Sequence, residues 1–248
     1  MKMYKVSLLL TTYNTAKYLP VTLESIKSQT YKPIEVVIVD GCSTDGTVDI
    51  IKQFEKDKDS DIELRWISEP DSGLYNAMNK ACSICTGDII AVCNDCLCEK
   101  NAVALFVKAI EDAGDECIGA HSDLVYKDGD RIIRTWHMGD GKIEQGWMPG
   151  HPALFLKRKV YDRYGNYDEA FHCAADYEFM VRFLTDEKNR LAYIPKVLVA
   201  MFYGGTSNAG LRNYLVSFKE GYRALRFNQV KHPLWITLKR TWRVLRQF

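Results

Sequence analysis

Apolar and polar residues follow two alternating patterns through about the first 110 residues. Short apolar runs typical of buried strands occur at Val6–Thr12, Ile34–Asp40, Leu64–Ile67 and Ile89–Cys93. Segments with apolar residues at helical spacing lie between them, at Leu19–Gln29, about Thr47–Phe54 and Gly73–Cys85. Strands and helices in alternation predict an α/β fold, with right-handed βαβ units around a mostly parallel central sheet flanked by helices.

The pattern changes after residue 116. Residues 117–136 alternate around the turn at Asp128–Asp130, which predicts two antiparallel strands. Further along we expect a loop at Gly139–Gly150, a strand at Ala153–Leu156, a helix at Asp176–Leu184, an extended segment at Leu191–Ala200 and helices from Asn213 onward. This divides the chain into a main domain, 1–211, with halves 1–116 and 117–211, and a C-terminal helical tail, 212–248.

The composition is that of an ordinary globular protein, with 47% hydrophobic and 26% charged residues. No apolar run approaches the roughly 18–20 residues that cross a bilayer. The apolar run at Val6–Leu10 is too short for a signal peptide. The eight cysteines do not have the even spacing of a secreted disulfide scaffold, so we expect a cytoplasmic protein with reduced thiols.

Charge is distributed unevenly between the main domain and the tail. From Arg212 onward there are nine basic residues and one acidic residue, a net charge of +8, whereas the first 211 residues have a net charge of −7. On a helical wheel of 234–248, one arc holds Leu234, Trp235, Leu238, Trp242, Leu245 and Phe248. Basic residues lie opposite, with Ile236 and Val244 as exceptions, which predicts a peripheral helix on an anionic membrane. The alternative is a helix packed on its own domain or on a partner copy.

Polar residues stand at the carboxyl ends of three predicted strands, where open α/β sheets bind ligands. They are Thr11–Asn14, Asp40–Ser43 and Asn94–Asp95. The pairs Cys82/Cys85 and Cys93/Cys96 have the spacing of zinc or iron–sulfur ligands, but no glycine-bearing knuckle accompanies them. A cysteine metal cluster is therefore a remote alternative. No G-x-G-x-x-G follows the first strand, which argues against a dinucleotide-dependent dehydrogenase.

Five segments in order resemble family 2 glycosyltransferases of bacterial polysaccharide assembly. They are VSLLLTTYN (6–14), EVVIVDGCSTDGT (35–47), EPDSGLYNAMNKA (69–81), GDIIAVCNDC (87–96) and AADYEFMVRF (174–183). The resemblance covers about residues 4–205. It implies a GT-A fold and transfer of a sugar from a nucleotide-diphosphate sugar, with a UDP-sugar as the expected donor. It gives no reason to expect a nucleic-acid partner.

The resemblance also implies roles for the strand-end residues. Asp40 matches the aspartate that contacts the nucleobase, although a turn former is the alternative. Thr11, Tyr13 and Asn14 match the segment that packs base and ribose, with Tyr13 as a stacking face or a loop anchor. Asp71 and Gly73 match a loop beside the nucleotide.

One departure from the family pattern concerns the divalent cation. Relatives usually carry two consecutive acids after the fourth strand, one near the ribose and one on a Mn²⁺ or Mg²⁺ that bridges the diphosphate. Here Asp95 matches the first acid and Cys96 replaces the second. A thiolate is a poor ligand for these cations, so either Asp95 alone holds the metal or metal use is weakened.

Asp176 matches the family's general base, which takes the proton of the acceptor hydroxyl; the alternative is a helix N-cap. Further candidates for diphosphate or acceptor contacts are Lys80, His151 and Gly205, each with a structural alternative as a solvated, loop or turn residue. The resemblance implies inversion at the anomeric carbon and a glycan or lipid-linked acceptor at the cytoplasmic face of the membrane. An inactive, partner-binding family member is the competing hypothesis, because Cys96 departs from the pattern.

Overall fold

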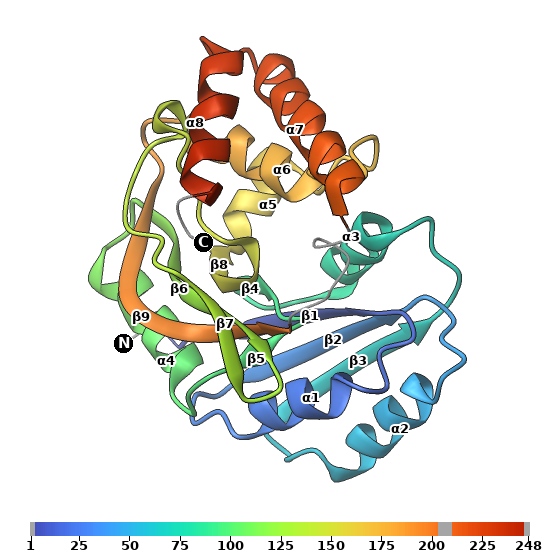
Figure 1. Ribbon diagram of the computed structural model, residues 1–248. Helices are drawn as coiled ribbons and strands as arrows, with labels where there is room; N and C mark the ends of the chain where they lie inside the picture. Colours follow the sequence, from blue (N-terminus) through green and yellow to red (C-terminus); the bar gives the residue numbers. More distant parts are fainter. Residues whose placement is uncertain (1–2, 203–209, 246–248) are drawn as a thin grey trace.

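A mixed sheet of nine strands runs through the computed structural model, which describes residues 3–202 and 210–245 (Figure 1). The strands are β1 (Val6–Thr12), β2 (Ile34–Asp40), β3 (Ile62–Ser68), β4 (Ile89–Val92), β5 (Cys96–Leu97), β6 (Cys117–Asp128), β7 (Arg131–Trp136), β8 (Leu154–Lys157) and β9 (Arg190–Phe202). Their order is β3-β2-β1-β4-β8-β6-β9-β5, and β7 pairs with β6.

The first four strands form the predicted parallel unit, since β1 pairs in parallel with both β2 and β4, and β2 with β3. Beyond β4 the sheet becomes mixed, because β8 is antiparallel to both β4 and β6. The predicted antiparallel pair at 117–136 is confirmed as β6 and β7. The two halves of the predicted main domain therefore meet inside one sheet, at the β4–β8 and β5–β9 pairs.

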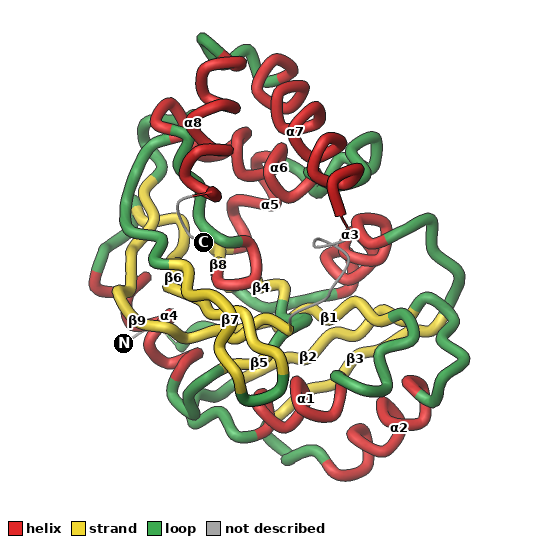
Figure 2. The backbone as a smooth tube through the Cα atoms, in the orientation of Figure 1, coloured by secondary structure: helices red, strands yellow, loops and turns green. Residues whose placement is uncertain are grey.

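Helices cover both faces of this sheet (Figure 2). They are α1 (Leu19–Lys27), α2 (Thr47–Asp57), α3 (Leu74–Ile84), α4 (Ala102–Asp112), α5 (Arg158–Tyr164), α6 (Ala175–Leu184), α7 (Gly210–Phe227) and α8 (Pro233–Leu245). The sequence pattern did not predict α4, α5 or the two-residue strand β5. Short 3₁₀ turns occur at Ile143–Gln145 and His151–Ala153, the first inside the predicted loop.

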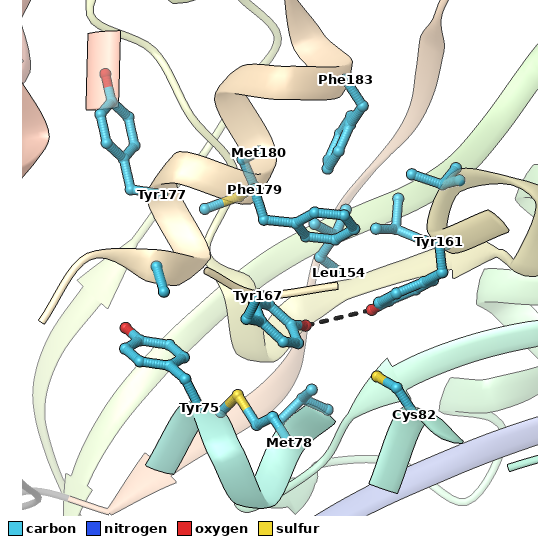
Figure 3. Close-up of a cluster of buried hydrophobic side chains, with 14 of the residues drawn as sticks. Tyr75, Met78, Cys82, Leu154, Tyr161, Tyr167, Tyr177, Phe179, Met180 and Phe183 are labelled. Atoms are coloured by element: carbon cyan, nitrogen blue, oxygen red, sulfur yellow. Dashed lines mark hydrogen bonds between the residues drawn. The ribbon is translucent and has the colours of Figure 1, made fainter. Parts of the chain in front are cut away.

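Alternate residues of the central strands point to opposite faces and build two cores. On one face Leu9, Val37 and Val39 pack with residues of α3, α5 and α6. On the other face the strands pack with residues of α1, α2 and α4. The first core includes an aromatic cluster in which Tyr161 and Tyr167 share a hydrogen bond, 3.3 Å between hydroxyl oxygens (Figure 3).

The helical tail belongs to the first of these cores. Ala224 and Leu225 of α7 and Ile236 of α8 are buried in the same cluster as Phe179 of α6. The boundary predicted at 211/212 falls one residue after α7 begins at Gly210, so it cuts a helix. The tail is therefore an integral layer of the domain. In the described residues no helix is both long and apolar enough to cross a membrane.

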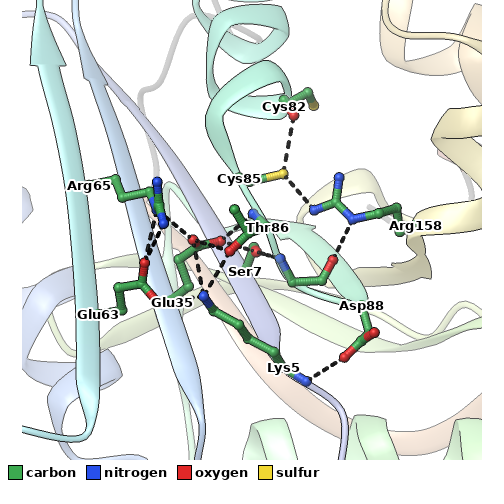
Figure 4. Close-up of polar contacts among 11 residues, drawn as sticks. Lys5, Ser7, Glu35, Glu63, Arg65, Cys82, Cys85, Thr86, Asp88 and Arg158 are labelled. Carbon is green, nitrogen blue, oxygen red and sulfur yellow. Dashed lines mark hydrogen bonds and ion pairs between the residues drawn. The ribbon is translucent and has the colours of Figure 1, made fainter.

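A buried carboxylate fastens the first strands together at the amino ends of β1 and β4 (Figure 4). Glu35 of β2 is fully buried and accepts hydrogen bonds from the Ser7 hydroxyl and from the backbone and side chain of Thr86. Lys5 and Arg65 supply positive charge at 3.4 and 2.9 Å. Burial alone would raise the pKa of Glu35, but these partners together lower it to about 2.

We predict that Glu35→Gln lowers the free energy of unfolding by about 3 kcal/mol at pH 7, because the substitution breaks a buried charged network. The ordinary pKa is 4.5 and the folded value about 2, so the stabilisation is complete above pH 4.5 and is lost as pH falls toward 2. Urea denaturation at several pH values measures this.

The matched control is Glu63→Gln, since Glu63 pairs with the same Lys5 and Arg65 but is half-exposed. We expect a loss of about 0–1 kcal/mol. Equal losses in the two variants, or a Glu35→Gln effect that does not shrink below pH 4.5, would contradict the account.

Candidate active site

A cleft of about 640 Å³ opens at the carboxyl ends of β1 and β4, as the strand-end argument predicted. It brings together residues that lie far apart in the sequence. Those expected from the sequence are Thr11, Tyr13, Asn14, Asp71, Gly73, Asp95, His151 and Asp176. Asp40, Lys80 and Cys96 do not line it, and Gly205 lies outside the described residues.

Asp40, the last residue of β2, is fully buried behind the cleft wall. One carboxylate oxygen accepts hydrogen bonds from the hydroxyls of Thr12 and Ser43, at 3.0 and 2.5 Å. The other accepts from the Ser43 amide and the Ser68 hydroxyl, at 2.9 and 2.7 Å. Burial would raise the pKa of Asp40, but these bonds hold it below its usual value. All four acceptor positions are filled, so Asp40 shapes the loop instead of presenting a free oxygen to a nucleobase.

The loop that Asp40 organises supports the segment after β1. The Ser43 hydroxyl accepts a hydrogen bond from the Asn14 amide at 2.8 Å, and the Asn14 side chain accepts one from the Thr44 amide at 2.9 Å. Asn14 adopts a positive φ of 52°, a backbone conformation that asparagine tolerates well. Tyr13 is consequently held with two-thirds of its side chain exposed at the cleft.

Asp71 and Gly73 form a second loop that faces Tyr13. The Gly73 amide donates to Asp71 at 2.9 Å, and Gly73 has a φ of 130° that disfavours any residue with a Cβ. Asp71 approaches Gly41 so closely that a Cβ there would lie 2.5 Å from Asp71 Oδ2 and 3.4 Å from the Tyr13 ring. Gly41 thus permits Asp71 and Tyr13 to lie side by side at the cleft edge.

The end of β4 contributes Asn94 and Asp95. Asn94 bridges to Thr11 through two hydrogen bonds, accepting from its amide at 2.7 Å and donating to its hydroxyl at 2.9 Å. Asp95 accepts a hydrogen bond from the Phe202 amide at 3.2 Å. Desolvation by burial raises the pKa of Asp95 to about 6, since a single backbone donor compensates it poorly.

Cys96 leaves the cleft immediately after Asp95. It opens β5, pairs with Ala200 of β9, and its thiol contacts Thr22 of α1. Burial raises the pKa of the Cys96 thiol to about 11, which keeps it protonated at neutral pH. Within the described residues, no three His, Cys, Asp or Glu side chains gather to hold a metal. The Cys85 thiol instead donates a hydrogen bond to the Cys82 carbonyl and accepts one from the Arg158 guanidinium.

Among the described residues at the end of β4, the carboxylate placed in the cleft for a divalent cation is that of Asp95. Asp95 is poorly hydrogen-bonded and lines the cleft, which fits one oxygen ligand for Mg²⁺ or Mn²⁺. Such cations commonly take their other ligands from substrate phosphates and water. The residues present therefore fit a cation brought with the donor diphosphate, not a preformed protein cage.

Asp176 stands in the first turn of α6 and also lines the cleft. The helix N-cap is Ala174, so the N-cap alternative for Asp176 does not hold. Its Oδ1 accepts hydrogen bonds from the Tyr75 hydroxyl at 3.1 Å and the Tyr177 amide at 2.8 Å. Among the described residues nothing donates to Oδ2, so that oxygen can accept a proton.

Glu178, two residues after Asp176 on the same helix, is not placed to replace it. It is buried, lies 3.0 Å from Arg182 and accepts a hydrogen bond at 3.0 Å from Asn228, the residue that follows α7. These contacts fasten α6 to α7 and turn Glu178 away from the cleft.

The side chains of His151 and Lys80, which the sequence offers as diphosphate or acceptor contacts, are both bonded to protein groups. His151 is nearly buried, its Nε2 lies 2.8 Å from the Tyr167 hydroxyl, and burial lowers its pKa. A neutral imidazole adds no positive charge, although His151 does line the cleft. Lys80 donates to the Pro70 carbonyl at 2.8 Å and pairs with Glu69 at 2.7 Å, outside the cleft.

Sequence reasoning missed two groups of cleft residues. Tyr75 follows Gly73 by two residues, in the first turn of α3, and its place in the 69–81 motif was a signal available from sequence. The far wall comes from the mixed half of the sheet and includes Tyr126, Trp136, Met148, Met201 and Phe202. No local motif marks those residues, because only strand pairing brings them to the cleft.

Comparison with known proteins agrees with this geometry. Over 214 residues the chain is 31% identical to a PGL/p-HBAD biosynthesis glycosyltransferase of Mycobacterium bovis, covering 82% of this chain and 78% of that protein. It is also 40% identical to the putative teichuronic acid biosynthesis glycosyltransferase TuaG of Bacillus subtilis, over 35% of this chain and 33% of TuaG.

Two solved structures are similar in fold. TarS 1-349 of S. aureus superposes with a TM-score of 0.70 at 15% identity, covering 98% of this chain and 72% of that one. The mannosyltransferase PcManGT of Pyrobaculum calidifontis, in complex with GDP-Man and Mn²⁺, superposes with a TM-score of 0.66 at 18% identity, covering 99% and 75%. Residues 7–184, most of the chain, match the family described as glycosyl transferase family 2. The chain therefore belongs to glycosyl transferase family 2 and has the GT-A fold.

Proposed function

We propose that this glycosyltransferase moves a sugar from a UDP-sugar to an acceptor hydroxyl with inversion at the anomeric carbon. The observation that carries the proposal is the placement of Asp176 in the same cleft as Tyr13, Asp71 and Asp95. The Asp176 carboxylate, whose Oδ2 has no donor among the described residues, thus lines the same cleft as the strand-end residues proposed to bind the nucleotide. This is the arrangement that a direct displacement requires.

At the donor end, the exposed ring of Tyr13 offers a stacking surface for a base, and Asp71 lies beside it. Asp71 Oδ2 is an acceptor of the kind that a uracil N–H needs. Asp40 supports Tyr13 indirectly, because it accepts a hydrogen bond from Ser43, whose hydroxyl accepts one from the Asn14 amide. A cation bound at Asp95 would neutralise charge on the leaving diphosphate. The two solved structures hold different bases, since one TarS structure is a complex with UDP-GlcNAc and the PcManGT structure is a complex with GDP-Man. Similarity in fold therefore does not select the base, and uracil is our proposal.

At the acceptor end, Asp176 takes the proton of the attacking hydroxyl on Oδ2. Tyr75 and Tyr177 both donate to Oδ1, which fixes the carboxylate and leaves Oδ2 directed to the substrate. Burial raises the pKa of Tyr75 far above its usual value, so its hydroxyl remains a donor at any working pH. Tyr75 is thus a positioning residue for the general base.

The acceptor that we propose is a hydroxyl of a glycan or a lipid-linked sugar in cell-surface polysaccharide assembly, on the cytoplasmic side of the membrane. The name of TuaG, a putative teichuronic acid biosynthesis enzyme, supports this class of pathway. The inactive-member alternative rests on Cys96, which stands where relatives carry a second acid. The active-enzyme proposal is supported instead by Asp95 and Asp176, which both line the cleft.

A panel of nucleotide sugars tests the proposed function. We expect UDP-sugars with Mn²⁺ or Mg²⁺ to raise the melting temperature and to be slowly hydrolysed, and EDTA to weaken both effects. Preference for GDP-sugars would overturn the uracil assignment. Binding of UDP without hydrolysis or transfer would favour the inactive alternative.

We predict that Asp176→Asn lowers turnover by about 10²–10⁴-fold, because the amide cannot take the hydroxyl proton. Calorimetry should show a Kd for UDP within about twofold of the parent, since the substitution keeps the size of the side chain and leaves Tyr13 and Asp71 unchanged. Glu178→Gln is the control from the same helix and should lose stability but keep turnover in the folded fraction. Near-normal turnover of Asp176→Asn would remove it from the mechanism.

Tyr75→Phe should lower kcat about tenfold and leave the Kd for UDP unchanged, because one hydrogen bond that positions Asp176 is lost. Tyr161→Phe is the matched control: its hydroxyl bonds to Tyr167 and does not touch Asp176. Steady-state kinetics and thermal melts on both variants separate positioning from packing. An equal loss of kcat in the two variants would show a packing effect and contradict the role.

A further inference from the structure

Helix α8 is anchored to the domain by one face. Ile236 and Thr237 are 2% exposed, and the Arg240 guanidinium lies 4.1 Å from the centroid of the Tyr177 ring on α6. Helices α7 and α8 run side by side at one end of the molecule (Figure 1). Ile236, an exception on the helical wheel, is thus the residue that docks the helix.

The opposite face of α8 is apolar and exposed to solvent. Its residues are Leu234, Trp235, Leu238 and Trp242, with exposed fractions of 55%, 61%, 44% and 60%. Their spacing places them along one side of the helix, and we call them the Trp–Leu ridge. Leu245 and Phe248, predicted on the same arc, have side chains outside the described residues. Four large exposed apolar residues on one helix form a surface that normally has a partner.

Basic residues lie along one flank of the ridge. The chain has no acidic residue after Glu220. The Lys239 ammonium lies 5.7 Å from the centroid of the Trp235 ring and donates a hydrogen bond to the Glu144 carbonyl at 3.2 Å, and Arg243 is exposed one turn further along. Lys231 is exposed at the turn between α7 and α8, close in sequence to the exposed ring of Phe227.

We propose that the Trp–Leu ridge is a membrane-docking surface whose partner is the interface of an anionic lipid bilayer. Tryptophan and leucine insert at the level of the headgroups, while lysine and arginine at the edge meet lipid phosphates. A second copy of the chain is a poorer occupant. Symmetric contact through the ridge would gather Lys239 and Arg243 of both copies at one interface, and α8 carries no carboxylate to compensate them.

Docking through the ridge also orients the cleft. The inner face of α8 contacts Tyr177, the residue next to Asp176, so the catalytic wall is tied to the docking helix. This orientation would place the cleft near a lipid-linked acceptor in the same membrane. The orientation argument rests on the proposed function, whereas membrane binding does not. Membrane binding itself needs neither donor nor acceptor and is measured separately.

Co-sedimentation of the full chain with vesicles tests the proposal. The vesicles contain phosphatidylcholine alone or with about one-third phosphatidylglycerol. We expect binding to the anionic vesicles that high salt weakens, with a blue shift of tryptophan fluorescence. Trp235→Ser/Trp242→Ser should reduce binding at least tenfold, and Lys239→Gln/Arg243→Gln about 20-fold at low salt. Val21→Ser/Ile132→Ser, which removes two similarly exposed apolar residues elsewhere, should bind like the parent.

Several results would overturn the proposal. These are absence of binding by the folded parent, equal binding by the ridge variant, or an equal loss in the Val21/Ile132 control. Light scattering that shows a dimer abolished by the ridge substitutions would assign the surface to a second copy instead. Hydrolysis of the nucleotide sugar by the ridge variant should match the parent, so a failure of docking is distinguishable from a failure of the proposed reaction.

Discussion

Three parallel strands, β1, β2 and β4, end at one edge of the sheet, and the polar groups at these ends must be satisfied within a mostly buried environment. The rest of the site depends on this constraint. Asp40 accepts four hydrogen bonds from Thr12, Ser43 and Ser68 and so fixes the loop after β2. Asn94 connects the end of β4 to Thr11 of β1 through two hydrogen bonds. Once these ends are fixed, the segment that carries Tyr13 has little freedom. The cleft is therefore built before any ligand arrives.

Three carboxylates at or near this edge show how environment separates function. Asp40 is saturated by donors and is structural in its direct contacts. Among residues 3–202 and 210–245, one backbone amide donates to the desolvated Asp95, so a bound cation there would restore lost interactions. In the same part of the chain, two donors reach Oδ1 of Asp176 and none reaches Oδ2. The number of hydrogen-bond donors thus separates the three carboxylates. Asp40 stabilises a loop, Asp95 is suited to bind a cation, and Asp176 is suited to accept a proton.

The C-terminal helices both support the helix that carries Asp176 and present an exposed apolar surface. Glu178 and Asn228 fasten α7 to the helix that carries Asp176, and Arg240 places α8 over Tyr177. The inner face of α8 is therefore fixed by the core, which leaves its Trp–Leu ridge exposed. In the described part of α8, Ile236 and Thr237 are the buried residues, whereas Leu234, Trp235 and Leu238 are exposed to solvent.

Local pattern in the sequence determined the parallel half of the sheet and its ligand edge, because β-branched runs and strand-end polar residues are encoded within a few neighbours. The family resemblance placed Asp176 and Asp71, and the structure brings both to the cleft. Other features depended on contacts between distant segments. Strand pairing decided that Tyr126 and Trp136 form the far wall, and saturation of Asp40 required Ser68 from the next strand. Cys96 turned out of the cleft because β5 pairs with β9. The side of α8 that faces water was decided in the same way, by the packing of Ile236 against a core that no local pattern reveals.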